Sequence, residues 1–266
     1  MAFQLATFFG GQGNQALRIQ DLIIDSKDRE NYITTSSNNF RVDLANPING
    51  RVVAYGLKSA VIPKTNYNIP AVRNTFTFNN SISTSTITIT PGNYTMTELL
   101  AEITTQLNAL GFDTYTVTYN SISGKVTFQS TLAAFTLNPT LDTSQGSILY
   151  KLGFVPGIAY TGGTVTSPNV ADISGIKSAY IKIKQLTQYM KNTTNSVLNF
   201  KVDLTCPFGS IVFFADEGRY HQYFNSNKDN LGSMGFFDVT LVDEYGTLLD
   251  LNGRDWSFVI QFITTN

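Results

Sequence analysis

The amino-acid sequence predicts a mainly β protein, a single jelly-roll β-sandwich that carries a small α+β insertion domain. The first observation is composition: the 266 residues include 19 Phe and 13 Tyr but only 14% charged residues, and aromatic residues favour strands. The second is that apolar and polar residues alternate with period two over most of the chain, as half-buried strands do. The third is one amphipathic helix near the middle, where the strand rhythm is interrupted.

Residues 1–17 are predicted to form a flexible arm outside the packed core. The segment is apolar and then Gly- and Gln-rich, with no charge before Arg18. Because such a segment cannot bury its side chains alone, we expect it to dock against a neighbouring protein. The residues expected to dock are Phe3, Leu5, Phe8 and Phe9.

The first part of the jelly roll is predicted over residues 18–66. The expected strands are residues 18–25, 40–44 and 51–62. Asn46-Pro47 and Asn49-Gly50 are expected to end the second of these strands, because proline and Asn-Gly pairs favour turns.

A helix is predicted directly after Pro91-Gly92-Asn93, which ends the preceding strand. Thr95 can cap it, and Glu98 three residues later completes a capping box. Apolar residues then recur at helical spacing and draw one stripe. The predicted core positions of this helix are Leu99, Leu100, Ile103 and Leu107, followed by Leu110.

This helix belongs to an α+β insertion domain predicted over residues 67–175, where a sheet of four or five strands covers it. The expected strands are residues 75–78, 86–89, 115–119 and 126–128, with a short one at 135–137. Residues 156–175 are rich in Gly, Thr, Ser and Pro and are expected to lead out of the domain.

The second part of the jelly roll is predicted over residues 176–266. The expected strands are residues 179–186, 198–204, 210–215, 237–242 and 257–263. Together with the first part they suffice for two four-stranded sheets packed face to face, and the wide excursions between them argue against a simple meander.

No catalytic, cofactor or metal site is predicted, so we expect a protein that is not an enzyme. His221 is the only histidine, and no Gly-x-Ser-x-Gly elbow is present. The single Cys206 excludes an internal disulfide and a cysteine-based zinc site. Residues 25–29 (DSKDR) balance their own charges, and we interpret the nearby carboxylates as turn-forming groups instead of a calcium site or a glycosidase pair.

Charge and hydropathy argue against a nucleic-acid-binding protein and against a membrane-spanning protein. The net charge is −1 and Lys and Arg are scattered, which provides no electrostatic footprint for nucleic acid. No apolar run approaches the length of a membrane span.

Several short motifs occur in order between about residues 20 and 263. They are Asp25-Ser26-Lys27-Asp28-Arg29, Phe40-Arg41-Val42-Asp43-Leu44, Ile62-Pro63 with Tyr67-Asn68-Ile69, Pro91-Gly92-Asn93-Tyr94-Thr95 with Glu98-Leu99-Leu100, Leu152-Gly153-Phe154, and Val239-Thr240-Leu241-Val242-Asp243-Glu244-Tyr245-Gly246. In their order and in their residues, these motifs resemble those of penton (vertex capsid) proteins of virophages, polinton-like viruses and related large DNA viruses.

The resemblance implies a structural virion protein, assembled in the infected host cell and located at capsid vertices. Proteins of that family are single jelly rolls whose homopentamers close the fivefold vertices of an icosahedral capsid. The implied partners are further copies of the chain and the double jelly-roll major capsid protein, and a host-surface receptor is left open as another. The resemblance implies no catalytic residues and no cofactor.

Two other functions stay open from the residues alone. One is a jelly-roll glycan- or receptor-binding head of a virion, or a secreted lectin, which would place exposed aromatics and carboxylates around a sugar. The other is a glycosidase on a β-sandwich, which would need two carboxylates facing one cleft.

Overall fold

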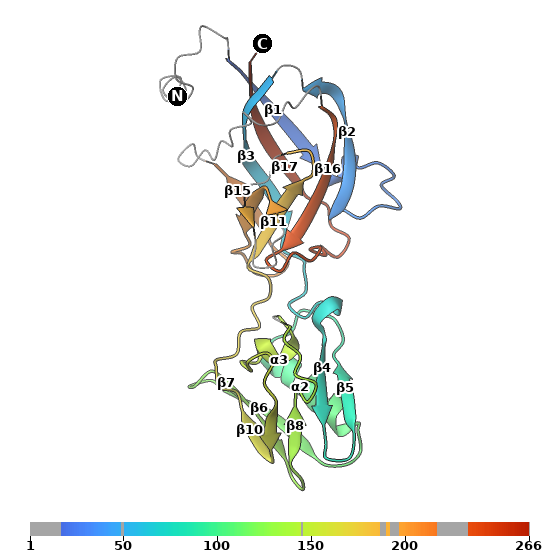
Figure 1. The fold of residues 1–266 in the computed structure, drawn as a ribbon, viewed down its shortest axis with the longest axis vertical. Helices are drawn as coiled ribbons and strands as arrows, with labels where there is room; N and C mark the ends of the chain where they lie inside the picture. Colours follow the sequence, from blue (N-terminus) through green and yellow to red (C-terminus); the bar gives the residue numbers. More distant parts are fainter. Residues whose placement is uncertain are drawn as a thin grey trace. The chain divides into compact units, whose positions relative to one another are not determined.

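The computed structural model describes residues 17–48, 51–144, 146–186, 190–191, 197–216 and 234–265. The chain divides into two compact units (Figure 1): residues up to Thr65 together with those from Ile176 on form the first, and Asn66–Gly175 form the second. The chain therefore crosses between the units twice, once after Thr65 and once before Ile176.

Two four-stranded antiparallel sheets make up the first unit. One has the order β1 (Leu17–Asp25), β17 (Ser257–Thr265), β3 (Arg51–Pro63), β15 (Ile211–Ala215), and the other has the order β14 (Phe200–Asp203), β11 (Ser178–Ile183), β16 (Met234–Asp243), β2 (Asn39–Ile48). Counted as eight strands along the chain, these sheets read 1-8-3-6 and 5-4-7-2, the double Greek-key order of a jelly roll. The predicted fold class is confirmed. Two short strands, β12 (Met190–Lys191) and β13 (Val197–Leu198), pair with each other.

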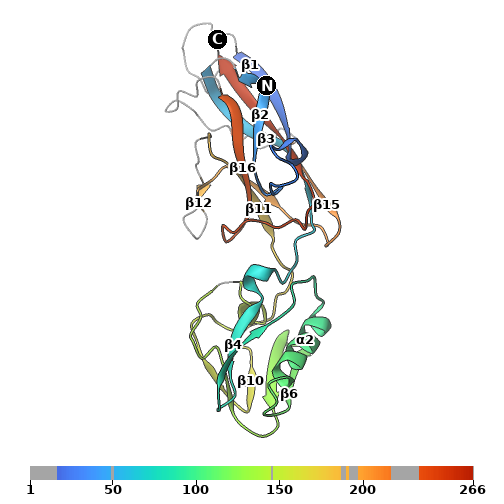
Figure 2. The ribbon, with the colours of Figure 1, turned by 90° about the vertical axis from the view of Figure 1, so that its right-hand side faces the viewer.

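The core of the first unit lies between these two sheets, which form separate layers in Figure 2. Aromatic side chains from both layers meet there: the rings of Phe237 and Phe262 stack with centroids 6.1 Å apart. Tyr55 contacts Phe200 edge-to-face. Because β17 is the second strand of its sheet, its inward residues are fully surrounded, and Phe258, Ile260 and Phe262 are at most 2% exposed.

The predicted end of β2 is wrong, because the strand continues through Asn46-Pro47 to Ile48. β2 is the edge of its sheet, where a proline without an N–H removes no ladder hydrogen bond. The register with β16 also shifts between Met234 and Phe236, so the pairing skips the segment that contains the proline.

The second unit is built around α2 (Met96–Asn108). Its capping box is present: the Thr95 hydroxyl accepts a hydrogen bond from the Glu98 backbone N–H, and the Thr95 backbone N–H donates to Glu98 Oε2 at 2.8 Å. The inward stripe of Leu99, Leu100, Ile103 and Leu107 is buried.

Two sheets pack with this helix. One has the order β5 (Thr84–Thr88), β4 (Thr75–Asn79), β8 (Phe135–Leu137), β9 (Tyr160–Gly162), and the other has the order β10 (Thr164–Thr166), β7 (Lys125–Ser130), β6 (Tyr115–Asn120). The second unit also contains a short helix, α3 (Ile148–Lys151), and a 3-10 turn, η2 (Ala71–Arg73). The first unit has one described 3-10 turn, η1 (Ser26–Asp28).

The sequence predicts one sheet and an irregular exit over residues 156–175, whereas that stretch supplies β9 and β10, one to each sheet. Each of these strands has three residues, too few for a periodic pattern. Threonine pairs bind them to their neighbours, with Oγ1 atoms 2.8 Å apart for Thr136 and Thr161 and 2.9 Å apart for Thr127 and Thr166.

Candidate interaction surface

The outer face of the sheet β1-β17-β3-β15 exposes large apolar side chains on both of its edge strands. On β1, Ile19 and Ile23 are 53% and 75% exposed, and on β15, Ile211 and Phe213 are 51% and 74% exposed. Strand alternation turns their neighbours inward instead, as for Ile24, which is 1% exposed. We name this outer surface the β1–β15 face.

The two central strands join these edges into one surface. Ile23 pairs with Val259, Val259 with Ser59, and Ser59 with Ala215. In the next row, Phe213 pairs with Val61, which like Val259 is half-buried. In these two rows, small or apolar groups therefore lie between the edge strands of the sheet.

Charge on the β1–β15 face is low. Asp21 and Lys58 form an ion pair, and Gln261 Nε2 donates to Asp21 Oδ1 at 2.8 Å. The hydrogen bond from Lys58, with that from Gln261, holds the pKa of Asp21 below its ordinary value. Asp25, at the end of β1, accepts a hydrogen bond from the Lys27 backbone N–H at 2.9 Å.

The opposite sheet has a charged outer face. Arg41 pairs with Asp43 at 3.1 Å and Lys201 with Asp203 at 2.7 Å, and all four side chains are well exposed. Its other half-buried or exposed charged residues are Lys182, Lys184 and Asp238. The two outer faces of the jelly roll thus differ in chemistry, one apolar with a neutralised ion pair and one charged.

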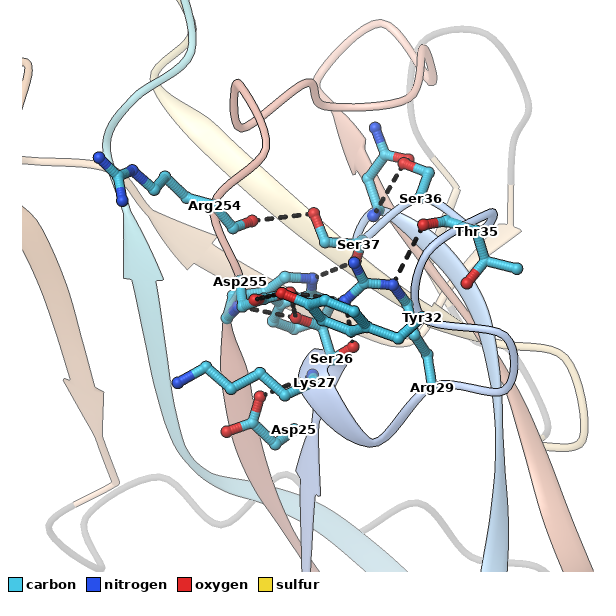
Figure 3. Close-up of polar contacts among 12 residues, drawn as sticks. Asp25, Ser26, Lys27, Arg29, Tyr32, Thr35, Ser36, Ser37, Arg254 and Asp255 are labelled. Carbon is cyan, nitrogen blue, oxygen red and sulfur yellow. Dashed lines mark hydrogen bonds and ion pairs between the residues drawn. The ribbon is translucent and has the colours of Figure 1, made fainter.

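A polar corner fixes β1 against β17 at one end of the β1–β15 face (Figure 3). Arg29 Nη1 lies 2.6 Å from Asp255 Oδ1, and their side chains are only 8% and 12% exposed. The Ser26 hydroxyl donates to Asp255 Oδ1 at 2.9 Å, and the Tyr32 hydroxyl donates to Asp255 Oδ2 at 3.0 Å. We name these four residues the Asp255 corner.

Backbone and ring contacts extend the corner. Ser26 N–H donates to the Trp256 carbonyl, and Trp256 N–H donates to the Ser26 hydroxyl at 3.0 Å. Arg29 Nε donates to the Thr35 carbonyl at 3.1 Å, and its guanidinium lies 4.0 Å from the centre of the Tyr32 ring. The turn after β1 is thereby joined to the segment before β17.

Asp255 is held as a carboxylate by its own chain. Burial acts to raise the pKa of Asp255, but the hydrogen bonds from Arg29, Ser26 and Tyr32 outweigh burial and lower it. Both carboxylate oxygens accept from side chains of the protein. The chemistry of this group is therefore that of a structural clamp.

The interpretation of Asp25 as a turn-forming group is confirmed, whereas the interpretation that residues 25–29 balance their own charges is wrong for Arg29. Arg29 pairs with Asp255, 226 positions away, and Asp25 caps the following turn with its side chain. Folding brings the charge partner from the far end of the chain.

The other predicted residues fall in different places. Phe3, Leu5, Phe8, Phe9 and His221 lie outside the described residues. Leu99, Leu100, Ile103 and Leu107 are core residues of the second unit, so they form no surface. Cys206 is partly buried and packs against the core of the first unit.

Within the described ranges, no three His, Cys, Asp or Glu residues gather closely enough to hold a metal ion. The helices of the same ranges are all too short or too polar to cross a membrane.

Sequence reasoning did not identify the β1–β15 face, although a signal for it exists. Leu22-Ile23-Ile24 and Ile211-Val212-Phe213-Phe214 are apolar on consecutive positions. In an antiparallel strand with one solvent-exposed face, apolar and polar residues normally alternate. A continuous apolar run therefore indicates that both faces of the strand are covered or make contacts.

Comparisons with known proteins give one family and several solved structures. The model of a family of unknown function (DUF5901) matches residues 20–221. Among curated proteins there is no match. The crystal structure of the mavirus penton protein is similar, with 12% sequence identity and a TM-score of 0.49, over 95% of this chain and 100% of that chain.

Proposed function

Because the chain belongs to the family of unknown function DUF5901, whose description assigns no activity, we propose a function from its surface and its motifs. The protein is a structural virion protein, the penton subunit whose homopentamers close the fivefold vertices of an icosahedral capsid. The observation that carries this proposal is the low-charge, apolar β1–β15 face on a jelly roll. The ordered motifs, which resemble those of penton proteins, support it independently.

The β1–β15 face has the properties of a subunit contact. Scattered exposed apolar residues are ordinary on a monomer, but a connected apolar surface rimmed by polar groups is typical of an interface. Burying Ile19, Ile23, Ile211 and Phe213 against a neighbour would contribute about 1–2 kcal/mol each. In a ring the contact is heterologous, so this face meets a different surface of the next copy.

The oligomeric mass of the purified chain tests the proposal. Native mass spectrometry or light scattering should find pentamers, and the double variant Ile23→Asp with Phe213→Asp should give monomers. Both side chains are about three-quarters exposed, so the jelly roll itself should remain folded. Ala101→Asp, at an exposed position of α2 in the second unit, is the matched control and should leave the pentamer intact.

A wild-type chain that stays monomeric at high concentration, and is absent from capsid vertices, would contradict the proposal. Binding in a glycan screen by such a monomer would favour the receptor-binding head instead. In the penton function the protein performs no catalysis and needs no cofactor.

The arm supplies the second contact of this function. Phe3, Leu5, Phe8 and Phe9 dock on the neighbouring subunit or on the double jelly-roll major capsid protein. Removing residues 2–13 should leave pentamers folded but release them from vertices at a lower temperature. A replacement of the same residues by a Gly/Ser segment of equal length is the control for spacing and should behave like the deletion. Undiminished vertex occupancy and thermal release would contradict this docking role.

A further inference from the structure

Three loops of the second unit meet at the end opposite to its two chain crossings. The crossings lie together, because Asn68 Nδ2 donates both to the Tyr94 carbonyl before α2 and to the Ile173 carbonyl. From there α2 runs to the far end of the unit. The loops at that end are residues 80–83 between β4 and β5, 109–114 between α2 and β6, and 131–134 between β7 and β8 (Figure 1).

Hydrogen bonds tie these loops to one another. Asp113 accepts from the Thr131 hydroxyl at 2.7 Å and from the backbone N–H groups of Leu132 and Ala133, each at 3.1 Å. The Ser81 hydroxyl donates to the Ala134 carbonyl at 2.5 Å. The loops therefore form one braced end, although they come from three places in the sequence.

Each loop presents one large apolar side chain to solvent at this end. Ile82 is 71% exposed, Phe112 is 49% exposed and Leu132 is 82% exposed. Ile82 follows Ser81, Phe112 precedes Asp113, and Leu132 itself donates its N–H to Asp113, so the bracing residues are next to the exposed ones. We name the three exposed side chains the apolar tip.

The surroundings of the apolar tip are uncharged apart from Asp113. Residues 79–84, 109–114 and 130–134 contain no Lys or Arg, and they are rich in Ser, Thr and Asn. The polar groups of Asp113 and Ser81 are occupied within the loops themselves. Few side chains remain here to form ion pairs with a partner.

We propose that the apolar tip inserts into the surface of a lipid bilayer with neutral headgroups. Side chains that protrude from loop ends reach below the headgroups, where apolar burial is favourable. The hydroxyl and amide groups around them suit the hydrogen-bonding headgroup layer.

The form of the apolar tip favours lipid over a protein partner, because three separate side chains on loop ends, 49–82% exposed, need no complementary surface in a fluid bilayer. Protein interfaces select their partners through aromatic and arginine anchors, hydrogen bonds and complementary charge. The loops of the apolar tip contain no cationic side chain, and the polar groups of Asp113 and Ser81 already form hydrogen bonds within the loops. The Asp113 carboxylate also opposes binding to anionic lipid, so the neutral bilayer is the better match.

Co-flotation of the full chain with phosphatidylcholine vesicles tests this proposal. The wild type should float with the vesicles, and the double variant Ile82→Ser with Leu132→Ser should partition about tenfold less well. Ile122→Ser is the matched control: Ile122 is 98% exposed but lies on the β6–β7 hairpin, at the other end of those strands. It should float like the wild type.

Three results would overturn the proposal: a wild type that does not float, an equal loss from Ile122→Ser, or binding that requires anionic lipid and ignores the tip substitutions. Phe112→Ser provides a second, independent variant and should also weaken flotation. Circular dichroism of each variant excludes unfolding as the cause. The double variant Ile23→Asp with Phe213→Asp is expected to be monomeric but still carries the apolar tip. Its flotation therefore tests the membrane proposal independently of the proposed ring.

Discussion

Among single residues, Asp255 joins the turn after the first strand of the jelly roll, β1, to the segment before its last strand, β17. Substituting Asp255 tests that connection directly. Asp255→Asn would leave the Arg29 guanidinium, whose side chain is 8% exposed, without its counter-charge. We expect a loss of about 2–4 kcal/mol in the free energy of unfolding, measured with urea. Asp203→Asn, which breaks an exposed ion pair, is the control and should cost less than about 1 kcal/mol. Equal losses would contradict a clamp at the Asp255 corner.

The same corner predicts how stability depends on pH. The folded state lowers the pKa of Asp255, so its contribution is present above the unfolded pKa of about 3.9 and is lost as pH falls through the folded pKa. The difference in melting temperature between wild type and Asp255→Asn should therefore be constant from neutral pH down to about 5, and should shrink below about 4. A difference that grows on acidification would contradict this assignment.

The Asp255 corner was not predictable from the sequence. Residues 25–29 contain charges of both signs, and local pairing accounts for them without any distant partner. Nothing in a single sequence indicates that residue 29 should contact residue 255, because that contact depends on the strand order. By contrast, the caps on α2 use neighbours three positions apart, which is why Thr95 and Glu98 could be identified directly.

Among the elements, α2 organises the second unit, and its buried stripe predicts the unit's response to a charge. Ile103→Asp would place an unpaired carboxylate at a position that is 0% exposed, at a cost of about 4 kcal/mol or more. We expect residues 66–175 to lose protection from hydrogen exchange while the jelly roll keeps its own. Ala101→Asp, at an exposed position of the same helix, adds the same charge and should leave exchange nearly unchanged. Loss of protection in both units would show that they do not unfold separately.

The sequence predicted the long elements better than the short ones, for a physical reason. α2 and β17 have enough residues for a period to be recognised. β9 and β10 have three residues each, and their pairing with β8 and β7 is fixed only by tertiary contacts. The continuation of β2 through Pro47 was missed because whether a strand lies at an edge is a property of the sheet.

For the whole molecule, the division into two units predicts that the second can be excised. Thr65 and Ile176 belong to the same unit, and Lys64 Nζ donates to the Ile176 carbonyl, so the two cut ends lie close together. Replacing residues 66–175 by a short Gly/Ser linker should leave a folded β-sandwich with a cooperative thermal transition. The isolated segment 66–175 should fold as well and is the complementary control. Aggregation of both pieces would contradict the division.

The change of rhythm near residue 67 and its return near 178 are the signals from which the sequence predicts an inserted unit. The order of strands within each sheet was not predictable, because alternation shows which residues face inward and does not show which strands are neighbours. The β1–β15 face depends on that order, and this is why it emerged only from the fold.

The position of β17 between β1 and β3 also constrains events on the ribosome. A nascent chain can complete the second unit as soon as Gly175 has left the exit tunnel, because all strands of that unit have then emerged. The jelly roll cannot close until residues 257–265 are available, since they pair with β1 on one side and β3 on the other. The first strands of the jelly roll therefore keep their apolar surface uncovered through most of translation. During this interval, proteins with long-range β topology are most prone to aggregate and to bind chaperones.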